Sequence, residues 1–431
     1  MKRLKLLILA LFTAISLGLP AKAAFAASIE LAQADFDAAV CADEPAATAK
    51  GIKCFTGGLY TLAKGDYKLT SNITLPDDAG LFLNDNGDYT LDLGSYTLAG
   101  HNNGNVLGIM NFGHSTTITG GTITNSNDTV YVFGSNATFK NTTIKSTERD
   151  ALYVADADTN GDNTPDTPSK TILENVTATG LVAVDGTSTL TIHGGTYTGN
   201  MSAAASTYYD YMNQTGGGNL VINSGTFAGG TWGASAVYTY TNGTLTINGG
   251  TFTSSEDAGV MAEGGTKSVT ITDGVFTGKY AGLSISDINT TVKLSGGTYK
   301  YTGESNEYRP AGAIVLTGTE QGSDLLKLLA DGYKYTDETA DKKVNTFEDP
   351  HGGDPEIYRF AFLTGKSVDI YKPNSSSEAA AATENDSTVG SPDSGFLTSG
   401  LANANASIIA TAAAATILTG LGFVIYKTAK H

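Results

Sequence analysis

The chain repeats one short pattern nine times between residues 88 and 300, and this repeat limits the folds that are open to it. The clearest copies are STLTIHGGTYTG, GTLTINGGTFTS and TVKLSGGTYKY, which begin at Ser188, Gly243 and Thr291. Aligned on the residue after the small or polar pair, the copies fall at Thr97, Thr122, Thr143, Thr177, Thr196, Thr226, Thr251, Val275 and Thr298. A period of about 24 residues is too long for hairpin meanders, and it predicts one solenoid coil per copy.

Apolar and polar residues alternate within a copy, which predicts a strand with one buried face. Leu190 and Ile192 alternate with threonines, and the Gly194-Gly195 pair marks a corner, because glycine tolerates positive φ. Each coil is expected to run strand, corner, short strand, loop. Stacked at about 4.8 Å per rung, the coils should form three inner columns: Leu190, Leu220, Leu245, Val269 and Val292; Ile192, Ile222, Ile247, Ile271 and Leu294; and Tyr197, Phe227, Phe252, Phe276 and Tyr299.

This pattern resembles the right-handed parallel β-helix of the pectate-lyase-like superfamily, especially the Gly/Thr-rich β-helical surface proteins of bacteria. The resemblance implies an all-β fold, with a right-handed parallel β-helix over residues 86–320, an N-terminal cap over 27–85 and a C-terminal cap over 321–372. Folds of this kind host lyases, hydrolases, phage tailspikes and adhesins, so the resemblance leaves the activity open.

Both caps carry signals of their own. Cys41 and Cys54 are the two cysteines of the chain, and such a pair in an exported protein predicts a disulfide that pins the N-terminal cap. At the other end, the leucines of SDLLKLLADGYKY predict a short amphipathic helix that Gly332 ends. Strand-like runs over 358–363 and 367–371 are expected to close the rod.

The two ends of the chain predict export and anchoring. Residues 1–26 have a basic start, an apolar run and small-residue cleavage signals, which predict a secretory signal peptide. Residues 373–405 are rich in Ser, Ala, Asn and acidic residues and predict a disordered spacer. Residues 406–426 are uncharged and long enough to cross a bilayer, and the lysines in 427–431 predict a cytoplasmic tail.

A candidate processing signal, Pro392-Asp393-Ser394-Gly395, lies in the spacer. It resembles the LPXTG-type signal that sortases cleave, and the resemblance implies a cut between Ser394 and Gly395. It departs from that signal at Ser391 and Ser394, which stand where Leu and Thr are usual, so simple membrane retention stays open as the alternative. Either anchor places the protein at the extracellular face of a bacterial cell membrane or in the cell wall.

The charge of the chain limits its partners. The formal net charge is -17 at pH 7, from 26 Lys+Arg against 43 Asp+Glu. Such a charge repels nucleic acid and other polyanions at long range, so nucleic acid is not expected as a partner.

An acidic insertion in the longest repeat predicts a metal site. DADTNGDNTPD places oxygen-bearing side chains at alternate positions, as a structural Ca²⁺ requires: Asp156, Asp158, Asn160, Asp162 and Asp166. The run resembles the calcium loops of thrombospondin type-three repeats and EF-hand-like loops, although Asn163 stands where Gly is usual. A solvated acidic loop without metal is the alternative.

Arg149 and Asp150, just before this loop, carry the enzymatic alternative. Pectate-lyase-like enzymes bind a uronate carboxylate through Ca²⁺ and use an Arg or Lys as base, so the resemblance also allows a calcium-dependent polysaccharide lyase or hydrolase. Against it, the chain has no recognisable lyase motif, and its acids Asp257 and Glu263 are among several that are scattered along the sequence. No catalytic residue is therefore assigned.

A tyrosine-rich segment provides the candidate ligand surface. Tyr208, Tyr209 and Tyr211 lie near the single tryptophan, Trp232, and such aromatic side chains stack on sugar rings or on protein partners. Packing of these tyrosines over the flank of the rod is the alternative. Together, these features predict an exported, anchored, non-enzymatic surface rod that is adhesin-like or structural and binds a glycan or a protein.

Overall fold

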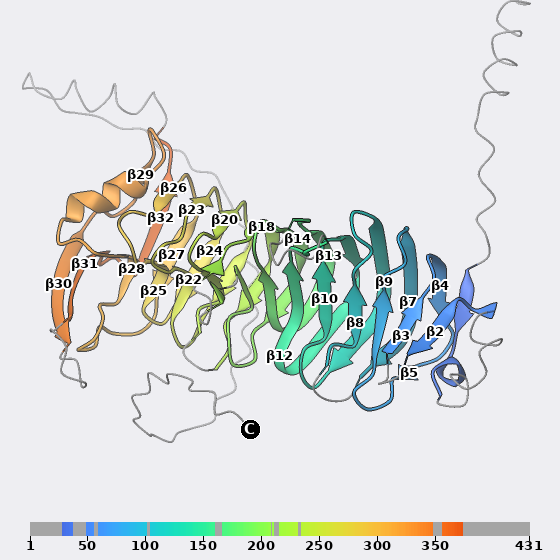
Figure 1. Cartoon of the computed structure of the whole chain (residues 1–431). Coiled ribbons are helices and arrows are strands. Elements are labelled where there is room, and N and C mark those ends of the chain that lie inside the picture. The colour runs from blue at the N-terminus through green and yellow to red at the C-terminus, as the bar shows by residue number, and fades with distance from the viewer. Residues whose placement is uncertain are drawn as a thin grey trace, which may run out of the picture. The chain divides into compact units, whose positions relative to one another are not determined.

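The computed structural model describes residues 28–37, 49–55, 59–100, 104–159, 166–207, 209–210, 215–231, 234–347 and 356–373. These residues form a parallel β-solenoid in which successive coils stack along the solenoid axis (Figure 1). Each coil contributes strands to three ladders of parallel strands, which we call the first, second and third faces.

The first and second faces are the two that the repeat predicts. The first face runs through β4 (Gly65–Leu69), β7 (Tyr89–Ala99), β9 (Ser115–Asn125), β11 (Asn136–Lys140), β13 (Lys170–Val184), β14 (Thr189–Thr198), β18 (Asn219–Ala228), β20 (Thr244–Ile247), β23 (Ser268–Ile271) and β26 (Thr291–Leu294). The second runs through β5 (Ile73–Thr74), the ends of β7 and β9, β12 (Thr143–Ala155), the following parts of β13, β14 and β18, then β21 (Thr251–Thr253), β24 (Val275–Gly278) and β27 (Thr298–Tyr301).

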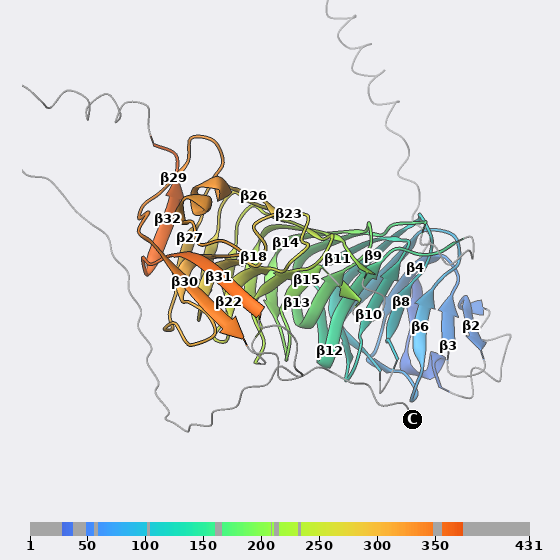
Figure 2. The same ribbon diagram turned by 60° about the vertical axis from the view of Figure 1, so that its left-hand side comes forward.

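The third face occupies the part of each coil that was expected to be loop. It runs through β3 (Leu59–Leu62), β6 (Gly80–Leu83), β8 (Leu107–Ile109), β10 (Val130–Phe133), the ends of β12 and β13, β15 (Ala205–Thr207), β19 (Val237–Thr239), β22 (Ala258–Ala262), β25 (Ala281–Ile285) and β28 (Gly312–Thr317). Figure 2 shows β6, β8, β10 and β12 following one another along this face. The expected loop was therefore wrong, because these strands are too short to show a period of their own.

The register predicted from the repeat is confirmed. Successive aligned positions, from Thr97 to Thr298, are ladder partners of one another. The repeat left the register open across the coils on either side of the acidic insertion, and the structure pairs Thr143 with Thr177 there. A slip of one residue would turn every apolar side chain outward, so the alternating pattern fixes this register.

The predicted inner columns form the core. The two aliphatic columns pair residue by residue from β14 to β26, and all their side chains are buried except that of Val292, which is partly buried. The aromatic column is a continuous stack with ring centroids 4.7 Å apart for Tyr197 and Phe227, 5.0 Å for Phe227 and Phe252, 4.9 Å for Phe252 and Phe276 and 4.8 Å for Phe276 and Tyr299. The ladder spacing therefore sets the spacing of the rings.

The glycine corner behaves as expected. Gly194 and Gly195 have φ angles of 75° and 97°, and a Cβ on Gly195 would lie 2.1 Å from the Val176 carbonyl oxygen. The neighbouring coil thus leaves no room for a side chain there, in addition to the backbone preference.

The first strands of the ladders lie within residues 27–85, the range predicted as the N-terminal cap. β1 (Ile29–Leu31) pairs in parallel with β4, and β2 (Ile52–Phe55) pairs antiparallel with β3. η1 (Gln33–Asp35), a short 3-10 helix, follows β1. Cys54 lies on β2, but Cys41 lies outside the described residues, so the disulfide stays a prediction.

The C-terminal cap ends each face with a separate element. η2 (Gly322–Leu328) is a 3-10 helix with Leu325 and Leu328 buried, and the residue after it bridges to Leu294 at the end of the first face. β32 (Ser367–Tyr371) pairs antiparallel with β27 and with β29 (Lys334–Tyr335) at the end of the second face. On the third face, β31 (Glu356–Leu363) pairs antiparallel with β28 and then with β30 (Ala340–Phe347) (Figure 1). The predicted helix and closing strands are confirmed, although the helix ends before Gly332.

The signal peptide, the spacer, the sortase-like residues 392–395 and the apolar segment 406–426 all lie outside the described residues, and each stays a prediction. Across the ranges that the structure describes, no helix combines the length and the apolar character that spanning a membrane requires.

Candidate functional site

The outer surfaces of the three faces differ in composition. The first two carry an outer column that is mostly threonine, as the repeat predicts. On the first face, Ile172 and Val221 interrupt the threonines, which are Thr90, Thr117, Thr138, Thr191, Thr246 and Thr270. On the second face, the column consists of the aligned repeat positions, all threonine except Val275. The corresponding column of the third face contains Phe82, Tyr131, Tyr153, Tyr238 and Met261 instead. The third face therefore has the outer column with the most aromatic side chains, although Tyr96 and Tyr301 on the second face are also partly exposed.

Three rings form an aromatic cluster on β10 and β12, consisting of Tyr131, Phe133 and Tyr153. Tyr131 and Tyr153 are ladder partners, and strand alternation turns Phe133 to the same outer side. Ring centroids are 5.6 Å apart for Tyr131 and Phe133, 5.6 Å for Tyr131 and Tyr153 and 5.9 Å for Phe133 and Tyr153, all edge to face. All three side chains are partly exposed, so the cluster presents aromatic surface to solvent.

A buried carboxylate, that of Asp128, borders this cluster. The Tyr131 hydroxyl donates to Asp128 Oδ2 at 2.7 Å, and the Asp150 backbone N–H donates to Asp128 Oδ1 at 3.4 Å. Arg149 Nη1 lies 3.6 Å from Asp128 Oδ2, and the Arg149 side chain is 64% exposed whereas that of Asp128 is 11% exposed. On the other side of the cluster, the Tyr153 hydroxyl donates to Asp185 Oδ2 at 2.8 Å.

The second carboxyl at this corner, Asp150, holds its proton unusually tightly. Burial first, and then the negative charge of Asp128, raise the pKa of Asp150 to about 7, while Arg149 opposes the change. Burial and the hydrogen bond to Asp128 also raise the pKa of the Tyr131 hydroxyl well above its usual range. Two carboxyls therefore share one exposed cation, and one of them is partly protonated near neutral pH.

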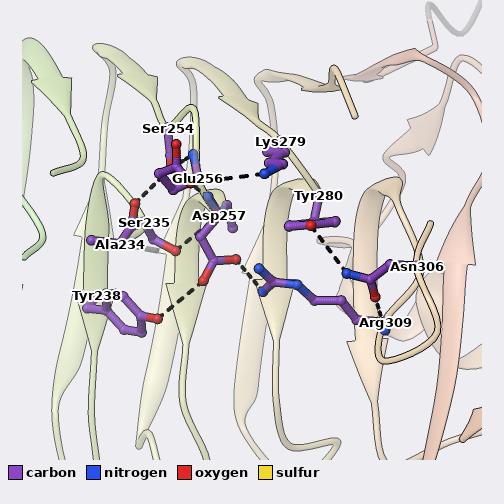
Figure 3. A network of polar contacts seen from close by, with 11 residues as sticks. Ala234, Ser235, Tyr238, Ser254, Glu256, Asp257, Lys279, Tyr280, Asn306 and Arg309 are labelled. Carbon is purple, nitrogen blue, oxygen red and sulfur yellow. Dashed lines mark hydrogen bonds and ion pairs between the residues drawn. The ribbon is translucent and has the colours of Figure 1, made fainter. Parts of the chain in front are cut away.

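A related network lies further along the same face (Figure 3). Arg309 Nη1 is 2.6 Å from Asp257 Oδ1, and the Tyr238 hydroxyl donates to Asp257 Oδ2 at 3.5 Å. The Arg309 guanidinium also lies 3.9 Å from the centre of the Tyr280 ring. Asn306 holds the Arg309 loop, because its Oδ1 accepts from the Arg309 backbone N–H at 2.8 Å. Asp257 is buried, and desolvation raises its pKa although Arg309 opposes this.

The C-terminal cap covers this end of the third face. Phe360 and Phe362 on β31 pack with Ala258, Ala281 and Val315, and Met261 packs against the same group. The aromatic cluster lies in the N-terminal part of the face, on β10 and β12, and these cap residues do not contribute to it.

The predicted calcium ligands lie in different surroundings. Asp156 accepts from the Thr187 N–H at 2.8 Å, from the Thr187 hydroxyl at 2.9 Å and from the Ser188 hydroxyl at 2.5 Å, which directs its carboxylate to the next coil. Asp166 Oδ1 accepts from the Thr159 N–H at 3.1 Å and from its hydroxyl at 2.7 Å.

Asp158 is exposed, and Asn160 and Asp162 lie outside the described residues. The described part of the chain contains no group of three acidic, histidine or cysteine side chains placed to hold a metal. The carboxylate oxygens fit a hard cation in kind, and the calcium site stays a prediction.

The residues predicted to stack on a ligand lie between β15 and β19 in the sequence. Tyr208, Tyr211 and Trp232 lie outside the described residues, whereas the backbone of Tyr209 belongs to β16 (Tyr209–Asp210), which pairs antiparallel with β17 (Thr215–Gly216). Ligand stacking by these residues stays a prediction.

The structure also adds residues that the sequence argument missed. The cluster of Tyr131, Phe133 and Tyr153 was not predicted, nor was the proximity of Asp128 to Arg149 and Asp150. Asp128 and Tyr131 are three residues apart at the start of a short apolar run, and this spacing was the sequence signal that could have predicted their contact.

Comparison with known proteins found no matching family model, no matching curated protein and no matching solved structure.

Proposed function

We propose that this protein is an exported, envelope-anchored surface rod that acts as an adhesin-like binding protein and recognises a glycan or a protein through its third face. The observation that carries the proposal is the partly exposed cluster of Tyr131, Phe133 and Tyr153, in a molecule whose other two faces have outer columns that are mostly threonine. Aromatic side chains of this kind bind partners well, because they bring large apolar area at low entropic cost.

Export and anchoring complete the proposal. The signal peptide over 1–26 delivers the chain, and the segment over 406–426 or the sortase-like residues 392–395 retain it at the outer face of the membrane or in the wall. The coils follow the right-handed parallel β-helix of the pectate-lyase-like superfamily. Calcium bound through the loop containing Asp156, Asp158 and Asp166 stabilises the rod, and a disulfide between Cys41 and Cys54 pins its N-terminal end.

A binding panel tests this proposal. The chain without its signal and anchor, from Ala27 to Ser375, is applied to arrays of glycans and host-exposed proteins with and without Ca²⁺, and sugar breakdown is followed in the same wells. Reproducible binding without product supports the proposal. Binding that survives replacement of both Tyr131 and Tyr153 by alanine refutes the assignment to the third face, and absence of any binding refutes the function.

One observation favours a second candidate, a carbohydrate-active enzyme on the same fold. Asp128, Arg149 and Asp150 meet at one corner, and the pKa of Asp150 is raised to about 7. A protonated carboxyl beside an ionised one is the pair that glycoside hydrolysis uses. Replacing Asp150 with asparagine separates the two functions: a glycoside hydrolase would lose its release of reducing sugar, whereas a binding protein would keep its ligand. A lyase would instead lose its release of unsaturated sugars when Arg149 is replaced with alanine.

A further inference from the structure

The third face contains two related arrangements of tyrosine, aspartate and arginine, with the two tyrosines four coils apart in one outward column. Tyr131 and Tyr238 occupy that column, and ladder pairing connects them through Tyr153, Ala183 and Ser206. Each tyrosine hydroxyl donates to a buried aspartate at a corner that leads into the face. Asp128 belongs to the same coil as Tyr131, whereas Asp257 belongs to the coil after that of Tyr238. Each aspartate has an arginine beside it.

The two arrangements differ in how closely the arginine contacts its aspartate and in how far its side chain is exposed. Arg309 lies 2.6 Å from Asp257 with its side chain 34% exposed, and its guanidinium stacks on Tyr280. Arg149 stays 3.6 Å from Asp128, longer than the about 2.8 Å of a charge-assisted hydrogen bond, and its side chain is 64% exposed. The Arg309 guanidinium is therefore in close contact with Asp257, whereas the Arg149 guanidinium makes only a long contact with Asp128 and is more exposed.

The arrangement at Asp128 is also short of positive charge. Asp150 adds a second carboxyl to the corner, and Asp185 borders the far side of the aromatic cluster through Tyr153. Arg149 is the cation that these contacts place at the corner. A ligand cation would here meet a buried carboxylate, a neighbouring carboxyl and partly exposed rings.

We propose that the corner of Asp128 and Tyr131, together with the aromatic cluster, binds the guanidinium of an arginine side chain on a partner polypeptide. The inference rests on the proposed binding function and names its partner chemistry. Asp128 forms the ion pair, the rings of the cluster stack on the guanidinium plane, and Arg149 moves aside.

Guanidinium fits this corner better than an ammonium does. It is planar and weakly hydrated, donates in a fork to a carboxylate and stacks on aromatic rings. The protein itself makes both contacts with Arg309, through Asp257 and Tyr280. The excess of acidic residues in the chain further attracts a basic partner.

The probe is a fluorescein-labelled peptide of alternating arginine and glycine, and its anisotropy is followed with the chain from Ala27 to Ser375. The matched peptide with citrulline keeps the shape and removes the charge, and peptides with lysine and chitosan oligomers test the ammonium alternatives. We expect the arginine peptide to bind about tenfold or more tightly than the citrulline peptide. Equal binding of arginine and citrulline peptides, or stronger binding of lysine peptide or chitosan, overturns the assignment.

Asp128→Asn and Arg149→Gln should change the affinity in opposite directions. Asp128→Asn should weaken binding of the arginine peptide about tenfold. The control Asp331→Asn, which removes an exposed carboxylate at the C-terminal cap, should leave binding unchanged. Arg149→Gln removes the internal competitor and should strengthen binding about threefold or more. Because misfolding cannot produce tighter binding, Arg149→Gln decides the matter even if Asp128→Asn does not fold, and unchanged or weaker binding by Arg149→Gln refutes the inference.

The failure of this inference differs from the failure of the proposed function. If the panel yields a ligand whose affinity is unchanged in Asp128→Asn, the surface rod still binds a partner and the arginine site is wrong. If neither the panel nor the peptides bind, both are wrong.

Discussion

Replacing Asp150 with asparagine should stabilise the protein at neutral and alkaline pH but not in acid. Burial and the charge of Asp128 raise the pKa of Asp150 to about 7 in the folded chain, against an ordinary value of 3.8. A carboxyl with a raised folded pKa favours folding fully below its unfolded pKa, and this contribution is lost as pH rises through the folded pKa. The loss therefore falls between about pH 4 and pH 7.

The size of the effect follows from the shift. A difference of about three pKa units, at about 1.4 kcal/mol per unit, gives a cost on the order of 4 kcal/mol for keeping Asp150 ionised above pH 7. Asparagine keeps the shape of the protonated carboxyl and avoids this cost. Above pH 7 the variant should thus be more stable than the unmodified chain by an amount of this order, and the gain should vanish near pH 4.

Urea denaturation of both proteins across this pH range measures the difference. Comparing the two proteins cancels the titration of the other carboxyls, and Asp331→Asn, which removes an exposed charge, should show no such pH dependence. A difference between Asp150→Asn and the unmodified chain that stays constant with pH would contradict the reasoning.

Three further predictions test the fold and the metal loop. Phe252→Ala removes the middle ring of the aromatic stack and should lower the free energy of unfolding by about 4 kcal/mol. The control Thr251→Ala changes an exposed side chain on the same strand and should lower it by less than about 1 kcal/mol. Equal losses in urea titrations would be inconsistent with a stacked core. Gly195→Ala places a methyl group 2.1 Å from a carbonyl oxygen and should cost about 2 kcal/mol or more, and an unchanged melting temperature would contradict the corner geometry. Calcium should raise the melting temperature, and Asp158→Asn should remove that rise; no response of the unmodified chain to Ca²⁺ or to chelator would argue for a metal-free loop.

Much of the solenoid could be predicted because its information is local. Alternation within each copy of the repeat decides which side chains are buried, and copies such as those at Thr196 and Thr226 then align in only one register. The third face could not be predicted in this way. A strand such as β15, with the sequence AST, shows no pattern of its own, and it forms because the coils on either side supply ladder partners.

The sequence by itself determined the coil period, the inner columns and the glycine corners, since each depends on residues within one coil. The candidate site depended on stacking between coils. Asp128 and Asp150 are 22 residues apart in the chain, yet one turn of the solenoid brings the carboxylate of one to the backbone of the other. Tertiary structure alone decided that these carboxyls share one arginine and that burial shifts the pKa of Asp150, because neighbouring coils and exclusion of water set those interactions.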